Sequence, residues 1–416
     1  MRLLRKALSL IRPQKPPLTS RIAHLKRFVS YQPSGGRPPY ESFDASKLRI
    51  VFIIPDFKPG AGGHMTIFRV AHYLETFGHQ VRFFIQNPTH HTSGEAAKGT
   101  INENFQPFEG QVDLFEGETP DAQGDALIAT DRYTCYPVQA MEQFIGRFYF
   151  VQDFEPSFYP AGAEALLSEA TYHLDFDCLC AGDWLSELMS KRYGRWAMSW
   201  PLAYDDRIYT LKPPSGVGTS KRTPLGEAPS DPNKTADHRS STRIALYARY
   251  VTPRRAVELA ILALDILYDR GVRFEVDFFG WPLGKLETRY PYRDHGVLNA
   301  EQLAELYRAS ALGVVFSATN HSLVNKEMMA CGLPVVDLDL ETVRSIFPPG
   351  TLAMAKPTPD GIADELERLL THPQERDKLA RAGLDYVADL SWETSSRQIE
   401  DALKTRLDQK RAAQHA

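Results

Sequence analysis

The sequence predicts an α/β protein made of two similar halves, each a parallel sheet covered by helices. Strand and helix patterns alternate over residues 48–193, and they alternate again from residue 243 onward. Between them, residues 212–242 carry many Pro, Ser, Thr, Asn and Gly residues and few large apolar ones. A chain of 416 residues is long enough for about two domains. We therefore expect two Rossmann-like, doubly wound domains that face a central cleft, with ligands at the carboxyl ends of the strands.

Apolar runs locate the strands of the first half, because parallel strands are buried on both faces and read as continuous apolar stretches. The first strand is expected at residues 48–55, followed by a turn and a helix over residues 64–77 that Gly78 ends. Further strands are expected at residues 81–86, 126–129, 148–151 and 176–181, with helices near residues 138–144, 164–173 and 184–193, the last capped by Asp183.

The second half repeats this pattern. Strands are expected at residues 243–248 and 274–279, and helices at residues 256–269, 301–309, 361–370, 374–386 and 392–407. Its central unit, residues 313–337, reads as a buried strand, a polar loop, a short helix from about Val324, a turn at Gly332 and a second strand. A loop that enters a helix presents unpaired N–H groups and the positive end of the helix dipole, which suits an anion.

These patterns divide the chain into five segments. They are a basic N-terminal arm (1–45), a first Rossmann-like domain (46–211), a linker or flexible insertion (212–242), a second Rossmann-like domain (243–390) and a final helix with a tail (391–416). Residues 1–12 are basic and apolar on one side, and this predicts either peripheral contact with an anionic membrane surface or a frayed tail. Residues 13–45 are expected to be extended.

Composition argues against several classes of protein. A net charge of −4 gives no general reason to expect nucleic acid as a partner. Four cysteines are too few for a disulfide framework, and the pair Cys178 and Cys180 is expected to pack inside the protein because no His or Cys cluster surrounds it. The sequence shows neither a run long enough to span a bilayer nor a signal peptide. We expect a cytoplasmic protein, peripheral at the inner face of the cell membrane, with no bound metal.

A glycine-rich turn, residues 60–63, follows the first strand. Glycines let a backbone approach a phosphate or a sugar closely, although a tight turn alone also accounts for them. A nicotinamide-binding fingerprint would need Gly or Ala at position 65 and an acidic residue near Gln86. The sequence has Met65 and no such acid, so we do not favour an oxidoreductase.

Two arginines, Arg249 and Arg254, follow the first strand of the second half. Guanidinium groups at a strand end can clamp a diphosphate, although the two could equally be surface charges. Glu327 lies about one turn into the short helix, where a carboxylate suits the hydroxyls of a ribose or sugar. In the first half, Asp153 and Glu155 follow a strand and could orient an acceptor hydroxyl or take its proton; the alternative for Asp153 is helix capping.

Together these motifs resemble family 4 glycosyltransferases of the GT-B fold. The resemblance rests on the Gly-Gly loop, the Arg and basic residue five positions apart, and a Glu followed by Met-Met-Ala-Cys-Gly-Leu-Pro-Val-Val. The stretches VQDFEP and HSLVNKEMMACGLPVV most resemble bacterial rhamnosyltransferases of surface glycans, of the S-layer type, that use dTDP-L-rhamnose. The resemblance covers roughly residues 48–407. It implies that the first domain lies on the acceptor side, that the second binds the nucleotide sugar, and that a C-terminal helix crosses back to the first domain.

The resemblance also implies roles for single residues. Arg249 and Arg254 would act on the donor diphosphate, and Asp153 would join them as a catalytic residue. Donor-binding roles fall on Gly62, Gly63, Gln152, Val297, Thr319, His321, Ser322, Leu323 and Glu327, and acceptor-binding roles on Glu155 and His64. Thr319 departs from the family, which has Glu at this position in contact with the transferred sugar; Asn320 or His321 could substitute for it.

We therefore expect a retaining, metal-independent glycosyltransferase that needs no cofactor and moves L-rhamnose from dTDP-L-rhamnose to a glycan or lipid-linked glycan acceptor. The alternative is a non-catalytic nucleotide-sugar or glycan-binding subunit of a membrane-associated assembly, which the Thr319 replacement would suit.

Overall fold

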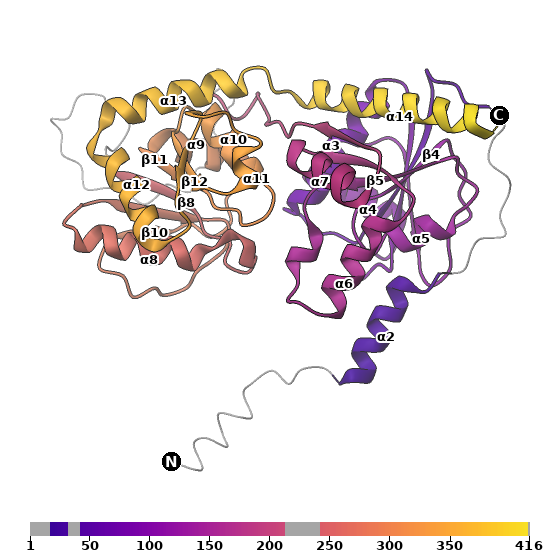
Figure 1. The fold of residues 1–416 in the computed structure, drawn as a ribbon, viewed down its shortest axis with the longest axis horizontal. Coiled ribbons are helices and arrows are strands. Elements are labelled where there is room, and N and C mark those ends of the chain that lie inside the picture. The colour runs from indigo at the N-terminus through magenta and orange to yellow at the C-terminus, as the bar shows by residue number, and fades with distance from the viewer. Residues whose placement is uncertain (1–16, 32–41, 213–241, 415–416) are drawn as a thin grey trace, which may run out of the picture. The chain divides into compact units, whose positions relative to one another are not determined.

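A computed structural model describes residues 17–31, 42–212 and 242–414 (Figure 1). The chain forms two compact units. Of the described residues, the first comprises 17–31, 42–150, 170–177 and 403–414, and the second comprises 151–169, 178–212 and 242–402. The predicted linker, residues 212–242, lies outside the described residues except at its two ends, and so does the basic segment 1–12.

The first sheet has seven strands in the order β3-β2-β1-β4-β5-β6-β7. Its strands are β1 (Arg49–Pro55), β2 (Gln80–Gln86), β3 (Gln111–Phe115), β4 (Ala126–Ala129), β5 (Gly146–Val151), β6 (Asp177–Ala181) and β7 (Ala197–Trp200). β1 pairs in parallel with β2 and β4, and all of its central residues are buried. The order reverses direction at β1, as expected for a doubly wound sheet.

Helices connect these strands. They are α3 (Gly62–Thr76), α4 (Gly94–Asn104), α5 (Cys135–Ala140), α6 (Ala163–Ala170) and α7 (Asp183–Tyr193), with short 3-10 turns η1 (Glu155–Phe158) and η2 (Thr171–His173). Apolar side chains cover the inner face of α3, among them Ile67, Phe68 and Leu74. Gly78, which has φ +101°, follows the C-cap of α3 and ends this helix as predicted.

The second sheet has six strands in the order β10-β9-β8-β11-β12-β13, and all of its pairings are parallel. Its strands are β8 (Arg243–Tyr247), β9 (Glu275–Phe279), β10 (Tyr292–Asp294), β11 (Leu312–Val314), β12 (Val335–Leu338) and β13 (Ala353–Ala355). The helices are η3 (Pro253–Arg255), α8 (Val257–Asp269), α9 (Ala300–Ala309), α10 (Leu323–Ala330), α11 (Glu341–Arg344), α12 (Pro359–Thr371) and α13 (Pro373–Val387). This sheet therefore repeats the doubly wound order of the first.

The last helix, α14 (Trp392–Gln414), has contacts in both units. In the second unit Ser395 Oγ donates to the carbonyl oxygen of Pro201, 2.6 Å away. In the first unit Arg406 Nη2 donates to Asp177 Oδ1 at 2.9 Å, and a Cβ atom on Gly146 would lie 2.5 Å from Leu407 Cδ2. The C-terminal part of α14 therefore packs directly on β5 and β6, so the predicted return of this helix to the first sheet is confirmed.

Several local predictions were wrong. Residues 18–29, expected to be extended, form helix α2 (Leu18–Val29), and Phe28 stacks on Tyr133 with ring centroids 4.1 Å apart. Asp183 does not cap α7 but is its first residue, and Gly182 holds the cap position. α5 begins three residues earlier than expected. The elements α4, β3, β7, β10, α11 and β13 had no predicted counterpart, because most are too short or too polar to show a period.

Candidate functional site

The connection from β11 to β12 has the predicted order of strand, loop, helix and strand. Ser322 is the N-cap of α10, and its Oγ accepts from Val324 N at 3.4 Å. Every residue from Asn325 to Ala330 is buried, so α10 is an internal helix. Gly332, with φ +70°, turns the chain into β12. In the loop of residues 317–322 only Ala318 is exposed. The other five residues are polar and buried, so their groups need partners.

The carboxylate of Asp153, just after β5, is the point on which Arg254, Thr319 and Asn320 converge. Asp153 Oδ2 accepts from Thr319 Oγ1 at 3.1 Å, and Oδ1 accepts from Asn320 N at 3.0 Å. Arg254 Nε lies 3.3 Å from Oδ2, and Phe154 N donates to Oδ1 at 2.8 Å. A hydroxyl, two backbone amides and a guanidinium therefore surround one anionic group. Asp153 does not cap a helix, because Phe154 is the N-cap of η1.

The turn that carries Arg254 is strained and tied to the same loop. Ala256 has φ +44° and ψ +41°, a left-handed conformation that costs a residue with a Cβ atom free energy. Ala318 N donates to the carbonyl oxygen of Arg254 at 2.8 Å, and the Arg254 guanidinium lies 4.4 Å from the centre of the Phe158 ring. Burial lowers the pKa of the neighbouring Arg255. These contacts fix the direction of Arg254 toward Asp153.

Arg249 lies apart from this group. Its Nε donates to Thr252 Oγ1 at 3.2 Å, and its guanidinium lies 5.6 Å from the centre of the Trp281 ring. It is half-buried in the turn after β8 rather than on the outer surface. The structure thus brings Arg254 to Asp153 but does not bring Arg249 to it.

A chain of hydrogen bonds runs from Asn320 to Lys326. Asn320 Nδ2 donates to the carbonyl oxygens of Gln152 (2.8 Å) and Ala181 (3.1 Å), so its Oδ1 is the acceptor for His321 Nδ1 at 3.0 Å. His321 Nδ1 therefore carries the proton, and Nε2 accepts from Lys326 Nζ at 3.4 Å. Burial holds the pKa of His321 well below its usual value, so the ring is neutral. Both ring nitrogens thus have partners within the protein, while the predicted donor contact of His321 is untested.

Beneath the loop, Asp337 at the end of β12 is fully buried and accepts from three donors. Asn325 Nδ2 lies 2.7 Å from Oδ2, and the amides of Leu338 (2.7 Å) and Ser317 (3.3 Å) donate to Oδ1. Burial raises the pKa of Asp337 to about 7 despite these bonds. Asp337 therefore links the start of the loop to the first turn of α10.

The other predicted residues of this unit lie at different depths. Gln152 contributes its backbone carbonyl to Asn320. Glu155 and Glu327 are 7% and 8% exposed, whereas Val297, in the loop before α9, is 67% exposed. Leu323 is the first residue of α10.

Gly62, Gly63 and His64 belong to the first unit, where they form the first turn of α3 rather than a loop ahead of it. His64 Nε2 donates to the carbonyl oxygen of Pro55 at 3.0 Å, and burial lowers the pKa of His64. Two of these three predicted residues are glycines at a helix N-terminus, and a Cβ atom on Gly62 would meet nothing within 4 Å.

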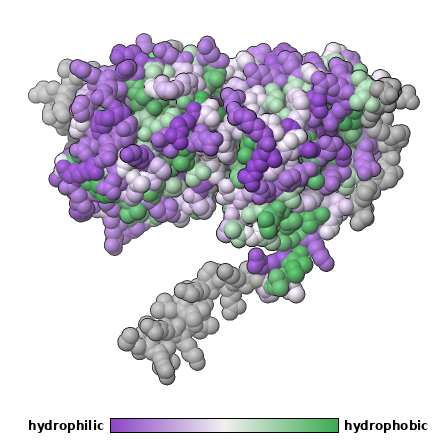
Figure 2. Space-filling view, in the orientation of Figure 1, coloured by the Kyte–Doolittle hydropathy of each residue, from purple (hydrophilic) through white to green (hydrophobic). Residues whose placement is uncertain are grey.

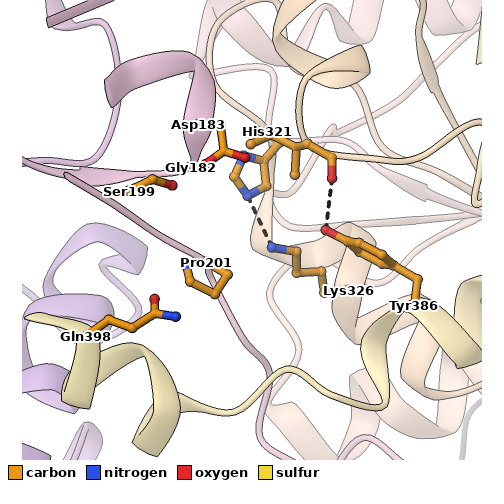
Figure 3. A pocket seen from close by; sticks show the side chains of 9 residues that line it. Gly182, Asp183, Ser199, Pro201, His321, Lys326, Tyr386 and Gln398 are labelled. Carbon is orange, nitrogen blue, oxygen red and sulfur yellow. Dashed lines mark hydrogen bonds between the residues drawn. The ribbon is translucent and has the colours of Figure 1, made fainter. Parts of the chain in front are cut away.

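A pocket of about 280 Å³ lies beside His321 and Lys326 in the second unit (Figure 3). Its walls also include Asp183 of α7, Ser199 of β7, Tyr386 of α13 and Gln398 of α14. Gly182, with φ +99°, allows the close approach here, because a Cβ atom on it would lie only 2.5 Å from Ile346 Cδ1.

Sequence reasoning missed Lys326 and Asp337. The signal for Lys326 was a charged residue in the middle of a short helix between two buried strands. Among the residues that the structure describes, no three His, Cys, Asp or Glu side chains gather where they could hold a metal ion. All four cysteines are free and buried. None of the described helices has both the length and the apolar character needed to cross a bilayer.

Comparison with known proteins agrees with this architecture. Residues 255–401 match the family model described as "Glycosyl transferase-like". The chain is 29% identical over 274 residues, 65% of its length, to the O-antigen biosynthesis protein RfbC of Myxococcus xanthus, but the match spans only 20% of that larger protein.

Solved structures with similar folds include Anabaena HepE in complex with UDP and glucose, with a TM-score of 0.62 and 14% identity; the match covers 86% of this chain and 100% of that one. Sucrose-phosphate synthase from Thermosynechococcus elongatus has a TM-score of 0.58 and 14% identity, with 89% and 99% of the two chains covered. The chain thus has the GT-B fold, with two parallel-sheet Rossmann-like domains and a C-terminal helix, and its residues 255–401 match a glycosyl transferase-like family model.

Proposed function

We propose that this protein is a glycosyltransferase that moves a sugar from a nucleotide-sugar donor to a glycan acceptor during synthesis of a bacterial surface polysaccharide. The observation that carries the proposal is the convergence of Arg254, the Thr319 hydroxyl and the Asn320 amide on one carboxylate. These donors lie in or beside the segment that matches the glycosyl transferase-like model. The similarity to an O-antigen biosynthesis protein and to HepE, which was solved with UDP and glucose, agrees with a nucleotide-sugar donor and a glycan product.

The chemistry follows from where charge develops. When the nucleoside diphosphate leaves, negative charge builds on its oxygens, and fixed cations and amides aimed at that charge lower the barrier. Arg254 supplies the cation, and the loop before α10 supplies backbone amides at a helix N-terminus. In the structure Arg254 pairs with the carboxylate of Asp153, which is itself an oxyanion. The groups around Arg254 therefore suit a negatively charged oxygen.

The finer proposal is that the donor is dTDP-L-rhamnose and that transfer is retaining and metal-independent. It rests on the resemblance of residues 151–156 and 321–336 to surface-glycan rhamnosyltransferases. Thr319 fits this site for a physical reason. Its hydroxyl donates to Asp153, whereas the family's Glu would place a second carboxylate against it.

Nucleotide binding provides the first test. Thermal unfolding is measured with dTDP, UDP and GDP, since a ligand at 100 times its Kd stabilises the folded state by about 2.7 kcal/mol. We expect dTDP to raise the melting temperature and UDP and GDP to have little effect. Stabilisation by UDP alone would overturn the rhamnose donor but keep the glycosyltransferase, and no effect from any nucleotide would count against both.

Transfer itself is tested by release of dTDP from dTDP-L-rhamnose in the presence of glycan acceptors, with and without EDTA, and by the anomeric configuration of the product. We do not favour the non-catalytic alternative, because the charged groups of the site are in mutual contact rather than dispersed. Donor binding without dTDP release, over a broad set of acceptors, would instead support the non-catalytic alternative.

We also propose peripheral contact with a membrane, from the cytoplasmic side, for access to a lipid-linked acceptor. Figure 2 shows apolar surface over α2, where Leu18 and Ile22 are 69% and 44% exposed beside the exposed Arg21 and Lys26. An apolar and basic helix suits an anionic interface. Flotation with vesicles that contain anionic lipid, compared with neutral vesicles, tests this contact.

A further inference from the structure

Lys326 is a buried lysine that no carboxylate of the described residues pairs with. Its residue exposure is 1%, and its Nζ donates to the carbonyl oxygen of Leu202 at 2.8 Å and to His321 Nε2 at 3.4 Å. A buried ammonium without a counter-charge is costly, and burial lowers the pKa of Lys326 to about 7. An ammonium has three N–H donors, so the two bonds that it makes to described residues leave one donor unused.

Among the described residues, the groups in contact with Lys326 carry no negative charge. His321 is neutral because Asn320 fixes its proton on Nδ1 and burial lowers its pKa. Arg255 adds a further positive charge near His321, and the Phe347 ring lies 6.0 Å from Nζ. The environment of Lys326 is therefore positive or neutral on the side of the loop.

The side of Lys326 that does not face the loop borders the pocket. Its volume of about 280 Å³ is enough for a small ligand, and Figure 3 shows Lys326 extending into it. Ser199 and Gln398 provide neutral hydrogen-bonding groups on the walls. Tyr386 donates its hydroxyl proton to the carbonyl oxygen of Ile346 at 3.1 Å, so its proton is already used. Asp183 stands at the exposed rim.

We propose that this pocket binds a small oxyanion, a carboxylate, phosphate or sulfate group, with Lys326 as its counter-charge. A ligand oxygen at the unused N–H of Lys326 would replace the missing ion-pair partner and keep the lysine protonated. The same chemistry arises from a free inorganic ion or from an acidic sugar of the acceptor glycan. The proposal does not depend on the donor or on transfer, because its test measures binding alone.

The expected pH dependence follows from the groups that face Lys326. In the free protein Lys326 is protonated below pH 7, His321 is neutral, and Asp183 and Tyr386 face the pocket from α7 and α13. Oxyanion affinity should therefore be full at pH 6 and fall as pH rises above 7, since binding then requires proton uptake by Lys326. From pH 6 to pH 8.5 we expect a loss of about tenfold or more.

The experiment is calorimetric titration of the full chain with sulfate, D-glucuronate and, as the neutral control, D-glucose, at pH 6 and 8.5. Both anions stay charged over this range. Tighter binding of glucuronate than of sulfate identifies an acidic sugar as the source, and the reverse order identifies a free ion. Absence of binding by both anions, or an affinity that does not fall with pH, overturns the proposal.

Three variants complete the test. Lys326→Met keeps the length of the side chain and removes the charge, and we expect at least about a tenfold loss of affinity at pH 6. Asp183→Asn removes the carboxylate at the exposed rim, so affinity should rise about two- to fivefold. Glu187→Gln removes a charge from the same helix but not from the pocket wall and should change little. If Lys326→Met does not fold, an unchanged affinity in Asp183→Asn still overturns the proposal.

Discussion

At the scale of single residues, the ion pair of Asp153 and Arg254 is stabilised by the neighbouring groups that also bind the Asp153 carboxylate. The Arg254 side chain is 27% exposed and that of Asp153 is 13% exposed, so the ion pair is neither buried nor free in solvent. Thr319 and Asn320 add donors to the same carboxylate, and the strained Ala256 follows the Arg254–Arg255 turn. Strain that a protein keeps beside a charged cluster is a mark of functional sites.

Replacing Arg254 tests whether this cation acts on the donor. We expect Arg254→Ala to lower turnover of nucleotide sugar at least about tenfold, because a fixed positive charge near the leaving diphosphate is lost. The matched control is Arg270→Ala, which removes a guanidinium of the same unit that pairs with Asp364 at 2.7 Å. Steady-state kinetics on both variants, with folding checked by thermal unfolding, decides the matter. Equal turnover in the two variants would remove Arg254 from the mechanism.

Asp337 provides a prediction on stability and pH. Its folded pKa of about 7 lies above the value of 3.8 expected in the unfolded chain. Between pH 4 and 7 the folded state keeps a proton that the unfolded state has lost. The free energy of unfolding therefore falls as pH rises through this window, and the penalty is complete above pH 7.

Asp337→Asn should remove that penalty. At pH 8.5 we expect the variant to be more stable than the parent by about 2–4 kcal/mol, whereas at pH 4, where the parent carboxyl is also neutral, the two should be similar. Among the described residues Asn325 Oδ1 has no hydrogen-bond partner, so a flip of the Asn325 amide can turn this oxygen toward the new amide group of residue 337. Denaturant unfolding at both pH values measures the difference, and equal gains at pH 4 and 8.5 would contradict the assigned cause.

At the scale of elements, the turn from β6 to α7, which contacts the loop before α10, requires a glycine at position 182. Gly182 joins β6 to α7 with φ +99° and ψ +161°, a region that is essentially closed to residues with a Cβ atom. Such an atom would also lie 2.5 Å from Ile346 Cδ1. Ala181, on the other side, accepts from Asn320. The turn at Gly182 therefore sets how closely the end of β6 approaches the loop before α10.

A pair of glycine variants at the two ends of α7 tests this. Gly182→Ala should cost about 1–3 kcal/mol from the backbone alone, and more from the clash with Ile346. Gly194, the C-cap of α7, has φ +65° and open space around it, so Gly194→Ala should cost only about 1 kcal/mol. Chemical denaturation of both variants gives the comparison. A loss at Gly182 no larger than that at Gly194 would show that the turn can relax.

At the scale of the whole molecule, the chain's architecture was predictable because its long elements carry their pattern locally. The apolar run of β1 and the helical periods of α8 and α12 identify themselves within a few residues. Strands such as β10 and β13 have three residues each, too few for a period. α2 was missed because basic and proline-rich sequence surrounds it.

The site was predictable only in part. The loop before α10 and Arg254 were identified from their place after strands, as the doubly wound topology requires. The contact of Asp153 with Thr319 joins residues 166 positions apart, and no local pattern reveals it. The charge on Lys326 was visible in the sequence, but its burial depends on how α10 packs between two strands. Local periodicity therefore gives the elements, and tertiary contacts decide which polar groups lack a partner.

Two compact units with separate cores should unfold as separate units, and one buried leucine from each unit allows a test. Leu407 is 1% exposed in the first unit, and Leu369 is fully buried in a core cluster of the second. Truncating either to Ala should cost about 2–5 kcal/mol. By calorimetry we expect Leu407→Ala and Leu369→Ala to lower different transitions, since each loss is confined to its own core. A single transition that both variants lower equally would mean that the units unfold together, and then α14 couples them strongly.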